Sequence, residues 1–216
     1  IRPASVVLVW DTDTYTPVWY EGRSLYLPGS TVEVTAFPVL SSRTTYDPAN
    51  LFYTWKEGTR RIAEGRGRSS ITLDPERSDR PRAISVTVET FDSILSAHNE
   101  ITITPAEADV VVYPVDPLRG VLAATPVNLK QGYVLARDEI SFTAVPYFVS
   151  VTSLADPLLS FDWSLNNTPL DQTGPTATFR REGGEGGRSE IRIRMNNSTH
   201  AYQSDSVSFP LIYNQD

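Results

Sequence analysis

Few residues in this sequence could do catalytic chemistry. His98 and His200 are the only histidines among 216 residues, and cysteine is absent. A serine nucleophile would need one of these histidines within hydrogen-bonding reach, and the sequence contains neither a GxSxG nucleophile elbow nor an HExxH metal motif. Without cysteine there are no disulfides, thiolate metal sites or thiol nucleophiles. We therefore expect a protein that is not an enzyme.

Oxygen donors for a cation are concentrated at one place. Asp11 and Asp13, in the stretch WDTDT, lie two residues apart at the end of a predicted strand, a spacing at which both carboxylates could bind one cation. Calcium is the cofactor that such ligands favour, with Glu107, Asp109 and Asp116 as further acidic residues. The alternative is that these Asp side chains form turns by accepting hydrogen bonds from their own backbone. No other cofactor is expected.

An aromatic cluster is the main candidate for binding. Trp19, Tyr20 and Tyr26 lie in VWYEGRSLY and exceed what one edge strand needs. Exposed aromatic side chains bind sugar rings and protein partners. The alternative is that Trp19 and Tyr20 close one end of a core or pack on the second half of the chain. Two glycine-rich stretches, GRGRSS (65–70) and EGGEGGRSE (182–190), do not fit the phosphate-binding spacing GxxxxGK[ST] and are expected to be loops.

Composition excludes some partners. The chain has 26 acidic and 19 basic residues, a net charge of −7, which disfavours nucleic acid. Hydrophobic residues make up 40% and charged residues 21%, as in folded proteins with a buried core. No run of about 18 apolar residues occurs, so we expect any membrane attachment to lie in segments outside this sequence.

These candidate residues sit on an internal repeat. TVEVTAFP (31–38) matches EISFTAVP (139–146), and 17 residues after each closing proline comes a tryptophan, Trp55 in LFYTWKEGTR and Trp163 in LLSFDWSLNN. The opening stretches SVVLVW and DVVVYP also match, in the same order along the chain. Such ordered similarity indicates duplication. We predict two domains, residues 1–105 and 106–216.

Apolar residues in each copy alternate with polar ones, as in half-buried strands, and turn residues follow every 8 to 12 positions. About seven strands in about 105 residues, with a tryptophan on the third main strand, predict an all-β fold of two tandem immunoglobulin-like sandwiches. Trp55 and Trp163 are then structural core residues, which fill the gap of about 10 Å between the sheets.

The stretches WDTDTYTPVWYEGRSLYLPGSTVEVTAFP, VDPLRGVLAATPVNL and TAVPYF carry a resemblance to known sequences. They resemble tandem Ig-like and PKD-like domains of uncharacterised exported surface proteins of small-genome, candidate-phylum bacteria. The resemblance covers most of the chain. It implies an extracellular, cell-surface location and no particular activity.

The expected function is a structural or adhesive module of a bacterial surface protein or appendage, with protein partners or self-association into filaments. An alternative is an adhesin that binds a glycan or protein through Trp19 and Tyr20. An enzyme ranks third. If the module assembles, SVVLVW could insert into another subunit. The repeat favours the other arrangement, in which this strand completes its own domain.

Overall fold

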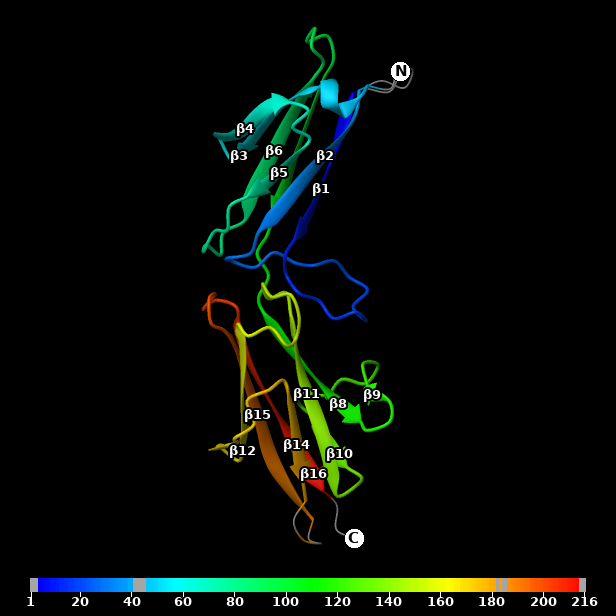
Figure 1. Ribbon diagram of the computed structural model, residues 1–216, viewed down its shortest axis with the longest axis vertical. Helices are drawn as coiled ribbons and strands as arrows, with labels where there is room; N and C mark the ends of the chain where they lie inside the picture. The colour runs from blue at the N-terminus through cyan, green and yellow to red at the C-terminus, as the bar shows by residue number, and fades with distance from the viewer. Residues whose placement is uncertain (1–3, 41–45, 182, 184–185, 214–216) are drawn as a thin grey trace. The chain divides into compact units, whose positions relative to one another are not determined.

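The chain folds almost entirely into strands. The computed structural model describes residues 4–40, 46–181, 183 and 186–213 (Figure 1). It divides into two compact units: unit 1 comprises residues 1–13 and 24–106, and unit 2 comprises residues 14–23 and 107–216. This division differs from the predicted domains, 1–105 and 106–216, at two places: residues 14–23 belong to unit 2, and Ala106 belongs to unit 1.

Unit 1 is a sandwich of two antiparallel sheets. One sheet has the order β1-β2-β5 and the other the order β4-β3-β6-β7. The strands are β1 Ser5–Thr12, β2 Val32–Val39, β3 Phe52–Glu57, β4 Arg60–Arg66, β5 Ser70–Leu73, β6 Arg82–Glu89 and β7 Ser96–Ile103. A 3-10 turn, Pro48–Asn50, precedes β3, and Asp47 caps it by accepting a hydrogen bond from the Ala49 amide at 2.9 Å.

Unit 2 is also a sandwich of two sheets, with additional short strands, one of which, β10, pairs with β16 in parallel. Its sheets have the orders β14-β11-β8-β9 and β10-β16-β15-β12-β13. The strands are β8 Asp109–Asp116, β9 Gly120–Val121, β10 Tyr133–Leu135, β11 Glu139–Tyr147, β12 Leu159–Leu165, β13 Thr168–Pro169, β14 Thr176–Arg180, β15 Gly187–Asn197 and β16 Ser204–Tyr213. The β12–β13 hairpin closes through Asn166 and Asn167, both with positive φ, as a two-residue turn requires.

Each unit encloses one core between its sheets. In unit 1 the inward residues of β1 and β2, such as Val34, contact those of β3 and β6, such as Val86. In unit 2 Phe142 and Ile193 face each other in the same way. The predicted all-β, immunoglobulin-like class is thereby confirmed. Alternation along the strands positions these residues, because every second side chain points inward.

The repeated tryptophans lie in these two cores. Trp55 and Trp163 are buried, and each indole Nε1 donates a hydrogen bond of 2.9 Å to a backbone carbonyl, that of Arg68 in unit 1 and of Gly174 in unit 2. A buried indole needs such an acceptor. The aromatic-x-Trp phrase therefore occupies the same structural position in both units.

The first two strands of each unit also pair in the same register. In unit 1 Val7 lies opposite Phe37, and in unit 2 Val111 lies opposite Val145. These are the residues that the sequence repeat aligns. β1 pairs with β2 of its own unit, so SVVLVW completes its own sandwich. The origin of the two units in one duplicated domain stays a prediction.

Candidate functional site

The aromatic segment Thr14–Arg23 lies against unit 2. The Tyr15 amide donates to the Val149 carbonyl at 2.7 Å, and the Phe148 amide donates to the Tyr15 carbonyl at 2.8 Å. These two bonds form an antiparallel bridge to the loop that follows β11. A turn then follows, in which the Tyr20 amide donates to the Pro17 carbonyl at 2.9 Å. These backbone hydrogen bonds hold the segment that carries the aromatic side chains in a fixed position on unit 2.

The rings of this segment pack on tyrosines of β8 and β11. Trp19 meets Tyr113 edge to face with centroids 5.6 Å apart, and Tyr20 meets Tyr147 in the same way at 5.5 Å. The Trp19 Nε1 donates to the Tyr147 hydroxyl at 3.3 Å. A Cβ at Gly22 would overlap the end of the Tyr20 ring, so glycine at this position makes room for the packing.

Two tyrosine hydroxyls beneath the segment bond to each other. Tyr113 and Tyr147 share a hydrogen bond of 2.7 Å. Burial, and then this hydrogen bond, raise the pKa of Tyr147 well above its ordinary value. A hydroxyl with so high a pKa is not placed to exchange protons near neutral pH, and this holds for Tyr147. The arrangement holds residues 14–23 on a sheet of unit 2.

The structure separates the three aromatic residues that the sequence grouped as a binding site. Trp19 is 36% exposed, Tyr20 is half-buried, and Tyr26 is fully buried in the core of unit 1. The Tyr26 hydroxyl donates to the Glu76 carbonyl at 3.4 Å, and burial raises the pKa of Tyr26. The expectation of three exposed rings therefore fails at Tyr26, because this ring fills unit 1 while Trp19 and Tyr20 cover unit 2.

Asp11 and Asp13 bond to the backbone. Asp13 accepts from the Thr31 amide and Asp11 from the Thr12 amide, both at 2.9 Å. Within the described part of the chain, no three His, Cys, Asp or Glu side chains are grouped to hold a metal ion. Asp116 likewise accepts from the Leu118 and Arg119 amides, and these bonds lower its pKa. The contacts of Asp11 and Asp116 are the local backbone bonds of the turn-forming alternative, whereas Asp13 bonds to a residue 18 positions further along the chain.

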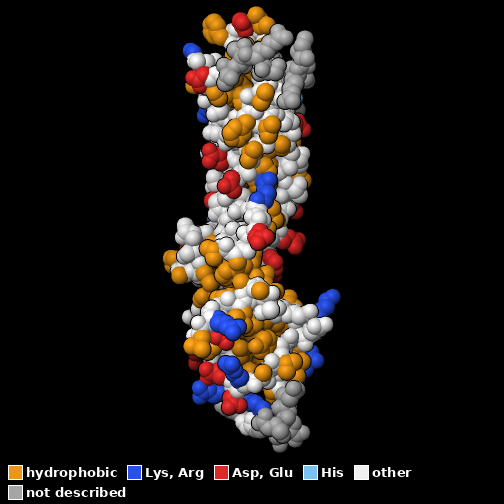
Figure 2. Space-filling model, turned by 90° about the vertical axis from the view of Figure 1, so that its right-hand side faces the viewer, with side chains coloured by type: hydrophobic (Ala, Val, Ile, Leu, Met, Phe, Trp, Pro, Cys, Tyr) orange, Lys and Arg blue, Asp and Glu red, His pale blue; other side chains and the backbone are white. Residues whose placement is uncertain are grey.

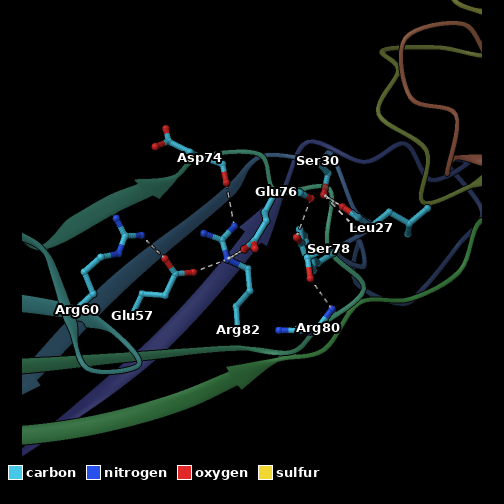
Figure 3. Close-up of polar contacts among 10 residues, drawn as sticks. Leu27, Ser30, Glu57, Arg60, Asp74, Glu76, Ser78, Arg80 and Arg82 are labelled. Carbon is cyan, nitrogen blue, oxygen red and sulfur yellow. Dashed lines mark hydrogen bonds and ion pairs between the residues drawn. The ribbon is translucent and has the colours of Figure 1, made fainter.

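A buried arginine, which sequence reasoning missed, organises one end of unit 1 (Figure 3). Arg82 donates to Glu57 at 2.7 Å and to the Asp74 carbonyl at 3.0 Å. Burial alone would raise the pKa of Glu57, but the hydrogen bonds and charges of Arg82 and Arg60 lower it overall. Two pockets of about 480 and 560 Å³ flank this cluster. The buried Arg82 is paired with Glu57 inside the protein, so this ion pair serves stability.

An open apolar face is the second feature that the sequence did not reveal. Val7, Val9, Phe37 and Val39 point outward from β1 and β2, each between 51% and 54% exposed. Figure 2 shows hydrophobic side chains gathered over this part of unit 1. We call these four residues the open face. Contiguous exposed apolar side chains commonly mark interaction sites.

Of the remaining sequence candidates, one histidine and the longer glycine-rich stretch are placed as follows. His98 contacts the Thr87 hydroxyl at 3.2 Å on an exposed strand. In the glycine-rich stretch 182–190, residues 182, 184 and 185 lie outside the described residues, and β15 begins at Gly187. None of the described segments forms a helix long and apolar enough to cross a membrane.

Comparison with known proteins gives weak likenesses. No protein-family model matches the chain, and no curated protein matches it. Among solved structures, the three N-terminal domains of the bacteriophage RB49 Highly Immunogenic Outer Capsid protein (Hoc) align over 97% of this chain at 18% identity and a TM-score of 0.48. The chain spans 59% of that protein's chain.

Two further structures extend this set. Fibronectin(III)-like modules of Clostridium thermocellum CbhA align over 96% of this chain and 95% of their own at 11% identity, with a TM-score of 0.30. The Yersinia pseudotuberculosis adhesin InvE aligns over 94% of this chain and 58% of its own at 17% identity, with a TM-score of 0.23. Identity and superposition are low in every case, and the fold rests on the strand pairing described above.

Proposed function

We propose that this chain is a non-enzymatic structural or adhesive module of an exported surface protein, and that it associates with copies of itself. The observation that carries the proposal is the open face of unit 1. Four apolar side chains on one outer sheet surface, each about half exposed, are stabilised when a partner removes them from water. The aromatic rings of residues 14–23 are already engaged on unit 2.

The proposal that the module is not an enzyme is supported by the pairing of its polar side chains within the protein. His98 bonds to a threonine hydroxyl. The perturbed pKa values of Tyr147, Glu57 and Arg82 all belong to groups paired with neighbouring side chains. Paired, buried groups of this kind serve packing and ion pairing, and nothing about them requires a substrate.

Sedimentation velocity over a wide concentration range, with electron microscopy of the concentrated sample, tests self-association. We expect the mean sedimentation coefficient to rise with concentration. A strict monomer at every concentration would remove self-association from the proposal.

A second candidate is adhesion to a protein or glycan through the turn between β6 and β7. Phe91 is 95% and Ile94 77% exposed there, while Asp92 accepts from Thr90 Oγ1 at 2.6 Å and from the Ile94 amide at 3.2 Å. The turn is therefore held in shape while it presents two large apolar side chains. Screening a glycan array with the wild type and Phe91→Ser would test this candidate, which predicts hits that the variant loses.

A further inference from the structure

The outer face of unit 2 that corresponds to the open face is covered. Because the registers match, Val7 and Phe37 correspond to Val111 and Val145. Val39 corresponds to Tyr147 for the same reason: Val39 lies opposite Ser5, the first residue of β1, and Tyr147 lies opposite Asp109, the first residue of β8. Val145 and Tyr147 are buried, whereas Phe37 and Val39 are about half exposed. The same surface is thus closed in one unit and open in the other.

The cover is a loop between the first two strands of a unit. Thr14–Arg23 lies in the chain between β1 and β2 of unit 1, yet it packs on Tyr113 and Tyr147 of unit 2. The segment in the same place in unit 2, residues 117–138, joins β8 to β11 and is called here the β8–β11 loop. Most of it folds on its own unit, because it contains β9, which pairs with β8, and β10, which pairs with β16. Its tip, the turn between β8 and β9, is the part that is free to contact another copy.

The β8–β11 loop presents an apolar tip. Asp116 accepts hydrogen bonds from the amides of Leu118 and Arg119, and Gly120, with a φ of 75°, turns the chain into β9. Leu118 is 96% exposed at this tip. A fixed turn that exposes a leucine loses little conformational entropy when it binds.

We propose that the open face of unit 1 binds the β8–β11 loop of a second copy of this chain, where Leu118 covers Phe37 and its neighbours. This inference rests on the proposed function and names its partner and surfaces. The tip of the loop, with Leu118, would cover on unit 1 part of the surface that corresponds to the one Thr14–Arg23 covers on unit 2.

The chemistry of each loop matches its face. Unit 2 carries Tyr113 and Tyr147, and it receives Trp19, whose Nε1 bonds to a tyrosine hydroxyl. At the corresponding places unit 1 carries Val9 and Val39, which offer no hydroxyl, so a leucine-bearing loop suits it better than an aromatic one.

Charge supports the same pairing. Asp11 and Glu33 lie opposite each other and continue the open face at one end, and both are exposed. Arg119, beside Leu118, is exposed as well. An acidic pair beside the face and a basic residue beside the leucine favour this orientation. Because loop and face are different surfaces, each added copy leaves one of each free, and the contact can repeat.

Sedimentation velocity of full-length Phe37→Asp and Leu118→Asp tests the contact. Each substitution introduces a carboxylate into the apolar contact, so we expect each to raise the concentration needed for assembly at least about tenfold. Tyr202→Asp, at an exposed position on the β15–β16 turn, is the control and should assemble like the wild type. Thermal melting followed by circular dichroism verifies that each variant is folded.

Mixing the two variants gives the sharper result. Phe37→Asp keeps an intact loop and Leu118→Asp keeps an intact face, so their mixture should form a dimer and nothing larger. Assembly of folded Leu118→Asp at wild-type concentrations would overturn this interface while leaving self-association intact. A wild type that stays monomeric would instead remove self-association itself, and this inference with it.

Discussion

Replacing Trp19 with alanine should destabilise unit 2 and leave unit 1 unchanged. About two-thirds of the Trp19 surface is buried, against Tyr113 and Tyr147. That corresponds to on the order of 150 Å² of apolar area, or about 4 kcal/mol as an upper bound. Since the freed segment regains conformational entropy, we expect the free energy of unfolding of unit 2 to fall by about 2–3 kcal/mol.

Hydrogen exchange read by mass spectrometry resolves the two units within one chain. A loss of 2–3 kcal/mol corresponds to about 30- to 150-fold faster exchange of the most protected amides of β8 and β11. Amides of β3 and β6 should exchange at the wild-type rate. Val18→Ala is the matched control, because Val18 is 99% exposed beside Trp19. Equal effects of the two substitutions, or equal effects on both units, would refute the reasoning.

Three further substitutions test the cores and the ion pair. Trp163→Ala should lower the free energy of unfolding of unit 2 by about 3–5 kcal/mol, measured by chemical denaturation. Glu57→Gln should cost about 2 kcal/mol at pH 7. Because folding lowers the pKa of Glu57, this difference should persist above the ordinary value of about 4.3 and vanish as the pH falls through the folded value. Tyr53→Phe should change stability by less than about 1 kcal/mol or increase it, because the buried Tyr53 hydroxyl has no hydrogen-bond partner among the described residues. Its control, Tyr113→Phe, breaks the bond to Tyr147 and should cost about 1 kcal/mol.

The architecture could be predicted because its signals are local. Alternation along Val32–Val39 places Val34 in the core whatever lies elsewhere in the chain. The repeated tryptophans mark equivalent positions, and a large indole on the inward face of a central strand is expected to be buried in the core. These features depend on neighbours close in sequence or on the comparison of the two halves.

The site could not be predicted because it depends on contacts distant in sequence. Trp19 lies 128 residues before Tyr147, and no periodic pattern within residues 14–23 shows that this loop packs on unit 2. The sequence did raise such packing, beside the hypothesis of an exposed binding site, but could not name the residues it would contact. Tyr26 resembles Trp19 in type and position, yet it enters the other core. Nothing in the sequence distinguishes Arg82 from the charged surface residues, because its burial depends on contacts with Glu57 and the Asp74 carbonyl that only the fold creates.

Hydroxyl-radical footprinting of the wild type across concentration tests directly whether the open face binds a second copy. Tyr113 and Tyr147 should resist oxidation at every concentration, because residues 14–23 cover them within the chain. Phe37 should be oxidised in dilute samples and become protected as copies associate. If Phe37 were oxidised at the same rate at all concentrations, the open face would not be an interface between copies. If Tyr147 were oxidised as readily as Phe37, residues 14–23 would not cover unit 2.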